Sequence, residues 1–172
     1  EECCPQKTGD FNIPLTEKGR MQAAEVSSKI GFDFIKSSLV YCSPYRRARE
    51  TLDEIIKSAG LTRNIIRIYE DPRLRETDFG YKDVKAQQEL RKIHGWFYYR
   101  FEGGESPADC YDRISAFLEN MARQVTRKGR DNVLIITHGL AIRCFVMRYL
   151  HLTVEQFDLM KNPKNCDIIT IG

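Results

Sequence analysis

The sequence predicts an α/β protein built as three layers, α/β/α, around a mostly parallel sheet. Short apolar segments alternate with longer amphipathic segments along its 172 residues, an order typical of parallel sheets covered by helices on both faces. The apolar segment at 132–137 (NVLIIT) is continuous and β-branched, as buried parallel strands are. A composition of 42% hydrophobic and 30% charged residues fits one globular domain over residues 1–172.

Apolar periodicity and turn residues give the order of the elements. The expected strands cover residues 38–42, 64–69, 132–137 and 167–171. The expected helices cover residues 17–30, 44–59, 84–98, 107–128 and 140–150. Ser43-Pro44 and Ser106-Pro107 each predict a capping serine followed by a proline in the first helical turn.

The composition also excludes several classes of protein. Lys and Arg total 27 against 24 for Asp and Glu, so a net charge of +3 provides no broad basic surface for nucleic acid. No apolar run approaches the roughly 20 residues of a membrane span, and no signal segment opens the chain, so we expect a cytoplasmic protein without membrane contact. Three histidines without clustered carboxylates, and no CxxC pair, predict neither a metal site nor a cofactor.

Functional residues are expected where strands end. In α/β sheets ligands bind outside the carboxyl ends of the strands, which selects residues 43–49, 75–79 and 137–139. Arg46, Arg47 and Arg49 surround the first turn of a predicted helix, where free backbone donors favour an anion and a guanidinium fork matches phosphate oxygens, so one of them could bind phosphate. Arginines are also common on solvated helix faces, and position alone slightly favours that reading.

The other candidates have equally plain alternatives. His138 ends a buried strand and opens a helix. It either binds a phosphoryl oxygen or forms its hydrogen bonds within the turn, where it caps the helix. Glu76 follows the second strand among charged residues and is suited to exchange a proton, although glutamates are frequent in surface loops. Glu105 follows two glycines that would let the backbone approach a ligand, but a helix-entry turn explains it equally well.

Several segments together carry a resemblance. They are Leu15-Thr16-Glu17-Lys18-Gly19-Arg20, Ser43-Pro44-Tyr45-Arg46-Arg47-Ala48-Arg49-Glu50-Thr51, Leu74-Arg75-Glu76, Gly104-Glu105-Ser106 and Thr137-His138-Gly139. In this order they resemble the histidine phosphatase superfamily, also called phosphoglycerate mutase-like, and the resemblance covers nearly the whole chain.

The resemblance implies roles for individual residues. Arg47 would be the second phosphate-binding arginine, Glu76 the proton donor and His138 the second, non-nucleophilic histidine. Thr8 and Gly9 would belong to a loop that touches substrate, and the sites at Glu105 and Gly139 would also bind it. The family uses no metal, and a different histidine forms a phosphohistidine intermediate.

One expected motif is missing. The Arg-His-Gly of the family, which carries the nucleophile and the first arginine on the first strand, does not occur in this sequence. Either the natural chain supplies that strand upstream of Glu1, which we favour because the sheet would otherwise keep open edges, or the protein is a non-catalytic relative that binds phosphorylated ligands or acts as a scaffold.

The residues near two motifs separate phosphatases from mutases. Thr77-Asp78-Phe79-Gly80 follows Glu76, where phosphoglycerate mutases carry Arg-His-Tyr-Gly. Leu140 stands two residues after His138, where phosphoglycerate mutases carry a polar residue. We therefore expect a phosphatase acting on a small phosphorylated metabolite, with a phosphoprotein as an alternative substrate and a mutase as an alternative activity.

Overall fold

The sheet of the molecule is parallel and has three strands in the order β2-β1-β3. The computed structural model describes residues 9–80 and 84–172. The strands are β1 (Leu39–Cys42), β2 (Ile68–Glu70) and β3 (Val133–Ile136). Every residue of the central strand β1 is buried, and its Cys42 pairs with Glu70 of β2 and Ile136 of β3. The predicted parallel α/β class is therefore confirmed.

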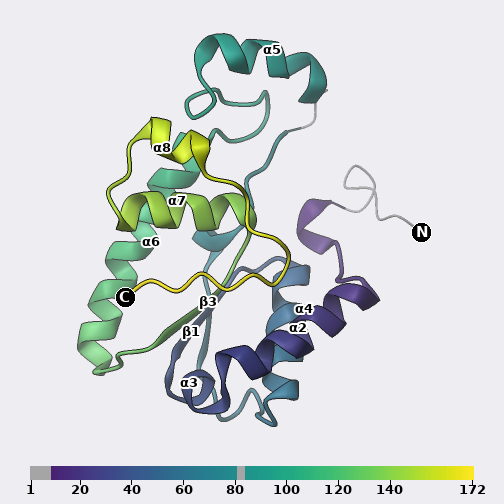
Figure 1. Ribbon diagram of the computed structural model, residues 1–172, viewed down its shortest axis with the longest axis vertical. Helices are drawn as coiled ribbons and strands as arrows, with labels where there is room; N and C mark the ends of the chain where they lie inside the picture. Colours follow the sequence, from purple (N-terminus) through teal and green to yellow (C-terminus); the bar gives the residue numbers. More distant parts are fainter. Residues whose placement is uncertain (1–8, 81–83) are drawn as a thin grey trace.

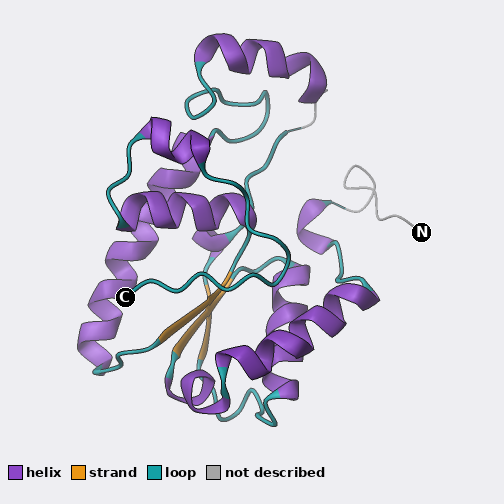
Figure 2. Ribbon diagram, viewed as in Figure 1, coloured by secondary structure: helices purple, strands orange, loops and turns teal. Residues whose placement is uncertain are grey.

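Helices cover both faces of the sheet (Figures 1 and 2). They are α2 (Glu17–Ile30), α3 (Phe32–Ser37), α4 (Arg46–Ser58), α5 (Val84–His94), α6 (Pro107–Lys128), α7 (Gly139–Tyr149) and α8 (Val154–Leu159), with single 3-10 turns η1 (Asp10–Asn12) and η2 (Pro72–Leu74). Among the described residues, no helix has the length and apolar character needed to cross a bilayer.

The alternation of side chains along β1 divides the core in two. Val40 points into a cluster that contains Leu52 and Ile55 of α4, whereas Tyr41 points into a cluster that contains Phe117 of α6 and residues of α7. The helices α2 and α4 therefore pack on one face and α6 and α7 on the other. Helix α5 stands apart from both layers, beyond the carboxyl ends of the strands (Figure 1).

Two of the four expected strands differ from the prediction. The second strand covers only Ile68–Glu70, because the chain turns between Thr62 and Ile65, whose side chain is exposed. The expected strand at 167–171 is absent, although three of its five residues are isoleucines, because no described strand lies beside it to pair with. An apolar run needs a neighbouring sheet edge before it becomes a strand.

The helix boundaries follow their caps. The Thr16 hydroxyl accepts a hydrogen bond from Gly19 N, as expected of an N-cap, and Ser106 forms a capping box with Asp109. Gly129 ends α6 in the left-handed conformation. The expected helix over 84–98 stops earlier, at His94, because Gly95 follows with a φ of +90°.

Candidate phosphoryl-binding site

The ends of β1 and β3 place Ser43 beside His138. The two strands are in register at Cys42 and Ile136, and Ser43 N donates to Ile136 O at 2.9 Å. The next side chains meet: a buried hydrogen bond of 2.8 Å joins Ser43 Oγ and His138 Nε2. Residues 95 positions apart in the sequence are thus adjacent at the carboxyl edge of the sheet.

The predicted capping role of Ser43 is wrong. Helix α4 begins at Arg46, its N-cap is Tyr45, and no side chain caps it. Ser43 Oγ accepts only a long hydrogen bond of 3.3 Å from Tyr45 N. The hydroxyl is directed to the His138 imidazole instead, because the parallel register brings that ring within reach.

His138 occupies the turn between β3 and α7 and is 8% exposed. Burial lowers the pKa of its imidazole to about 3, and the nearby positive charges of Arg47 and Arg113 act in the same direction. The ring is therefore neutral at physiological pH. A neutral imidazole among cations can donate a hydrogen bond to an anionic oxygen, and an anion bound there would restore some of its basicity.

The ring of Tyr45 lies against both His138 and Arg47. The Tyr45 and His138 rings meet edge to face with centroids 5.2 Å apart, and the Arg47 guanidinium carbon lies 5.0 Å from the Tyr45 centroid. Arg47 and His138, two of the predicted site residues, follow different strands and are therefore brought together by the Tyr45 ring. Sequence reasoning did not single out Tyr45, which lies inside the motif but carries no charge.

The guanidinium of Arg47 is bound to the Asp10 carboxylate. Its two terminal nitrogens donate to the two carboxylate oxygens at 2.9 and 3.2 Å, and one of them also donates to Asp10 O at 2.8 Å. Gly9 precedes this contact with a φ of +70°, whereas Thr8 lies outside the described residues. A two-pronged contact with a carboxylate is the geometry by which arginine also binds phosphate.

Glu76 follows η2 and approaches the amino end of α7. Burial raises the pKa of its carboxyl group, although the Thr77 amide, the Arg47 charge and the Leu140 amide oppose that shift. Thr77 N donates to Glu76 Oε1 at 2.9 Å. Burial thus favours the protonated form, which is the form required of a proton donor.

Glu105 lies between two arginines. Its carboxylate forms ion pairs with Arg75 and, at 3.1 Å, with Arg113. The adjacent Gly104 has a function other than the expected approach to a ligand: a Cβ there would stand 2.4 Å from Asp78 O. The glycine permits the 78–80 and 102–104 loops to touch, and Glu105 N donates to Asp78 O at 2.8 Å.

Arg113 is a site residue that sequence reasoning missed. Its side chain is 9% exposed, its Nε is buried without a hydrogen-bond partner, and its charge lowers the pKa of His138. The pattern held a usable clue, because Arg113 lies three residues after Cys110 and four before Phe117, at the edge of the apolar stripe of α6.

Gly139 is the first residue of α7, whose first intrahelical hydrogen bond runs from Ile142 N to His138 O. The amides before Ile142 have no acceptor within the helix and face the amino end, where a helix favours anions. No group of three or more His, Cys, Asp or Glu residues in the described part of the chain is arranged to hold a metal ion.

Comparison with known proteins decides the family. The profile of the histidine phosphatase superfamily (branch 1) matches residues 5–172. The chain belongs to this superfamily. A phosphoglycerate mutase-like protein of Arabidopsis thaliana is 39% identical over 93% of the chain and 64% of its own length. A broad-range acid phosphatase of Saccharomyces cerevisiae is 35% identical over 61% of the chain and 34% of its own length.

A solved structure has a similar fold. A mycobacterial glucosyl-3-phosphoglycerate phosphatase, determined with inorganic phosphate, has a TM-score of 0.72 at 22% identity, covering 92% of this chain and 79% of its own. That likeness shows that the two chains share a fold. The chain spans less than two thirds of the length of these curated relatives, namely 64% and 34%.

Proposed function

We propose that this chain forms the phosphoryl-binding part of a histidine phosphatase that hydrolyses a small phosphate monoester. The observation that carries the proposal is that Arg47 and His138 both lie against the Tyr45 ring, at the carboxyl edge of the sheet, with the Arg47 charge acting on the His138 imidazole. A cationic fork and a neutral imidazole donor are suited to hold the oxygens of a tetrahedral phosphoryl group.

Each residue has a separate task in the proposed reaction. Arg47 exchanges Asp10 for the phosphoryl oxygens, and His138 donates a hydrogen bond to one of them, while Ser43 keeps its ring in place. A histidine nitrogen attacks phosphorus as the bond to the ester oxygen breaks, and protonated Glu76 gives its proton to the departing alkoxide. Water then attacks phosphorus, Glu76 takes back a proton, and the phosphorus–nitrogen bond breaks.

The nucleophilic histidine is proposed to come from a segment upstream of Glu1. His138 is committed to the proposed role of oxygen ligand, His94 stacks on Tyr99 beyond the sheet, and His151 follows α7 with a φ of +54°. Among the described strands β3 pairs only with β1, so its second edge can accept a further strand. An Arg-His-Gly at the end of such a strand would enter the site beside His138.

The residues around Glu76 and His138 favour a phosphatase over a mutase. A mutase must hold two alternative phosphorylated positions of one substrate. In this chain Leu140 is buried and apolar, and Phe79 packs edge to face on Phe101 with ring centroids 5.1 Å apart. The proposed substrate is a small phosphorylated metabolite, and a phosphoprotein is the second choice.

The test uses the full-length protein and a radiolabelled phosphate monoester. We expect a phosphoenzyme that is labile in acid and stable in base, and we expect Arg47→Ala and His138→Ala to lower turnover by several powers of ten. Arg46→Ala is the matched control, because Arg46 is the neighbouring arginine of α4 and pairs with Glu50 on the exposed surface.

A defined result would contradict the catalytic proposal, and a separate measurement tests the non-catalytic alternative. If the natural sequence upstream of Glu1 contains no Arg-His-Gly and the full-length protein turns over no phosphate ester, the catalytic proposal is wrong. Calorimetry then decides whether the chain is a non-catalytic phosphate binder: binding of a phosphate ester that is lost in Arg47→Ala supports that function.

A further inference from the structure

The loop that carries Glu76 is tied at several points to the rest of the chain. Arg113 of α6 donates from its guanidinium to Arg73 O. Thr137, which directly follows β3, donates from its hydroxyl to Leu74 O at 2.7 Å. The backbone that precedes Glu76 is therefore held by α6 and by the end of β3.

Glu105 holds the same loop on both sides of Glu76. Its amide donates to Asp78 O at 2.8 Å, and its carboxylate forms ion pairs with Arg75 and, at 3.1 Å, with Arg113. Arg113 and Glu105 thus bond to each other and to the loop. We call these two residues the loop pair.

The loop pair and Arg75 together have an excess of positive charge. Two guanidinium groups share one carboxylate, so the three groups carry a net charge of +1. The side chains of Arg113 and Glu105 are only 9% and 15% exposed, so water and salt screen their charges weakly. The Arg113 Nε is buried without a hydrogen-bond partner among the described residues, which leaves that edge of the guanidinium without a countercharge.

The Glu76 carboxyl lies within reach of this charge. Groups from three helices and from its own loop act on it: the Arg47 guanidinium of α4, the Arg113 guanidinium and the Cys110 thiol of α6, the Leu140 amide of α7, and the Thr77 amide. Burial raises the pKa of the carboxyl, and both arginines and both amides oppose that shift. Arg113 therefore favours the carboxylate form of Glu76.

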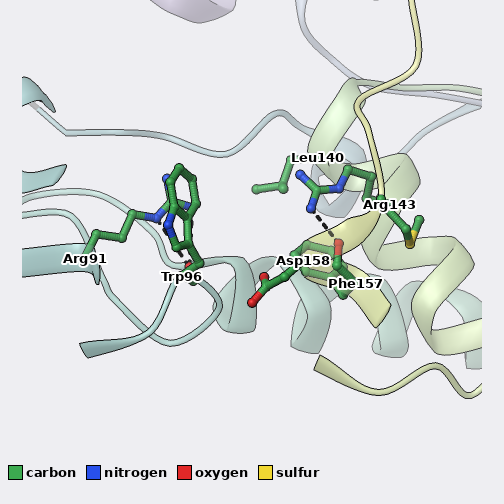
Figure 3. Close-up of a pocket in the computed structure, with 7 residues that line it drawn as sticks. Arg91, Trp96, Leu140, Arg143, Phe157 and Asp158 are labelled. Carbon is green, nitrogen blue, oxygen red and sulfur yellow. Dashed lines mark hydrogen bonds between the residues drawn. The ribbon is translucent and has the colours of Figure 1, made fainter. Parts of the chain in front are cut away.

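The neighbouring cavity contributes less to this environment. Leu140 lies between Arg91 and Arg143 in a cavity of about 230 Å³ (Figure 3). The strongest influences on the pKa of the Glu76 carboxyl include the Leu140 amide but neither of these two arginines. The positive charge that acts on Glu76 from α6 therefore comes from the loop pair.

The proposed reaction needs Glu76 in two protonation states. In the first half, the carboxyl gives its proton to the departing alkoxide as the phosphorus–nitrogen bond forms and the phosphorus–oxygen bond breaks. In the second half, a water oxygen bonds to phosphorus, a proton of that water passes to the Glu76 carboxylate, and the electron pair of the phosphorus–nitrogen bond returns to the histidine. Burial alone would return the carboxyl to its protonated form too early to accept that proton.

We propose that Arg113 and Glu105 are positioning residues for Glu76: they hold its loop, and their uncompensated positive charge keeps Glu76 a carboxylate until water attacks. This inference rests on the proposed function and assigns control of the second half-reaction to residues that need not touch substrate.

The first test measures the protonation of Glu76 directly in the full-length protein. Protonated carboxyl groups have an infrared stretching band, and the part of it that is lost in Glu76→Gln belongs to Glu76. Its titration midpoint should rise by about one pH unit in Arg113→Met, which removes a nearby positive charge, and fall by about one pH unit in Glu105→Gln, which removes the countercharge. The double variant should titrate near the wild-type midpoint.

The opposite directions exclude a merely structural effect, because both substitutions break the same ion pair. Arg113→Lys keeps the charge and should titrate near the wild-type midpoint even if the loop loosens. Arg123→Met and Glu119→Gln, which remove one charge of each sign from exposed positions on α6, are the matched controls.

The second test measures the two half-reactions with a radiolabelled phosphate monoester. At neutral pH, hydrolysis of the phosphoenzyme should slow about tenfold in Arg113→Met, because one unit of pKa changes the carboxylate fraction by that factor, and it should recover as the pH rises. In Glu105→Gln the formation of the phosphoenzyme should slow instead, because less of Glu76 carries a proton.

The outcomes separate the two proposals. Midpoints that stay unchanged, or that move in the same direction in Arg113→Met and Glu105→Gln, overturn the role of the loop pair whether or not the protein is an enzyme. If Arg113→Met does not fold, Glu105→Gln decides: a midpoint that is not below that of Arg113→Lys overturns the inference. A wild-type protein without phosphoenzyme or turnover overturns the proposed function, while the infrared titration still decides whether the pair sets the charge of Glu76.

Discussion

Ser43 Oγ and His138 Nε2 are 2.8 Å apart, and this buried contact joins the ends of the two strands that carry the candidate site. A ring held only by its own turn could rotate, whereas this one has a fixed partner directly after the central strand β1. The orientation of the imidazole therefore depends on the parallel register of β1 and β3, and not on the β3–α7 turn alone.

Ser43→Ala is expected to lower the free energy of unfolding by about 1–3 kcal/mol, because the buried imidazole nitrogen loses its partner. Urea denaturation measures the change. Ser28→Ala is the matched control: its exposed hydroxyl bonds a carbonyl of its own helix, and the expected change is within about 0.5 kcal/mol. Equal effects of the two substitutions would mean that the Ser43 contact does not hold the ring.

His138 makes stability depend on pH in a defined direction. The unfolded imidazole binds a proton near pH 6.5 and the folded one near pH 3, so the unfolded state binds more protons between these values. Stability is expected to fall as the pH decreases through this window. His138→Gln should reduce the slope of unfolding free energy against pH by up to about 1.4 kcal/mol per pH unit.

The midpoints of urea denaturation are measured at several pH values between about 3 and 6.5. His94→Gln is the control, because His94 is exposed on α5. If both substitutions change the slope equally, the burial of His138 does not cause the dependence.

The contact between Asp10 and Arg47 should compete with phosphate. Asp10→Asn removes the competing negative charge and is expected to tighten the binding of inorganic phosphate a few-fold, with a smaller gain at high salt, because the Asp10 side chain is 41% exposed. Calorimetry of the full-length protein tests this. Asp33→Asn on α3 removes an exposed charge away from the site and should have little effect; a weaker affinity in Asp10→Asn would instead assign Asp10 to ligand binding.

Glu76 is expected to donate its proton to the leaving group. Burial raises the pKa of its carboxyl, so the protonated form persists to higher pH and the rate should decline as the pH rises through that raised value. In the full-length protein, Glu76→Gln should lower kcat for an alkyl phosphate by about 10²–10⁴-fold. The loss should be much smaller for p-nitrophenyl phosphate, whose leaving group needs no proton.

Glu70→Gln, at the exposed end of β2, is the control for charge. An equal loss with both esters in Glu76→Gln would contradict the proton-donor role.

Gly104 has no room for a side chain. A Cβ at this position would lie 2.4 Å from Asp78 O and 2.7 Å from Gly80 N, so Gly104→Ala should force the two loops apart and destabilise the protein by about 1–3 kcal/mol. Gly19→Ala is the control, because its Cβ would meet the flexible end of Leu15 at 3.0 Å inside a helix. Thermal unfolding of both variants decides, and equal stabilities would contradict a tight contact between the loops.

Local sequence patterns were sufficient where local interactions decide the structure. The caps at Thr16 and Ser106 and the strand at 132–137 were predicted because each depends on neighbouring residues. The apolar run at 167–171 was predicted as a strand and is not one, because a strand also requires a partner that sequence neighbours cannot supply.

The candidate site divides in the same way. Glu76 and His138 could be selected from the sequence because each follows a strand, whereas only the family resemblance separated Arg47 from the neighbouring Arg46 and Arg49. The spacing of Arg113 on the apolar stripe of α6 was a clue, but its burial and the Ser43 contact could not be predicted, because a long-range approach and the burial of a charge are properties of the packed molecule.

The sequence by itself determined the alternation of strands and helices and the family motifs, because periodicity, caps and short motifs act over a few residues. Only the tertiary structure decided which charged groups lie close together. Asp10 binds Arg47, Glu105 lies between Arg75 and Arg113, and Arg91 and Arg143 line one cavity. The physical reason is that desolvation and Coulomb interactions depend on distance in space, and the fold sets that distance independently of separation along the chain.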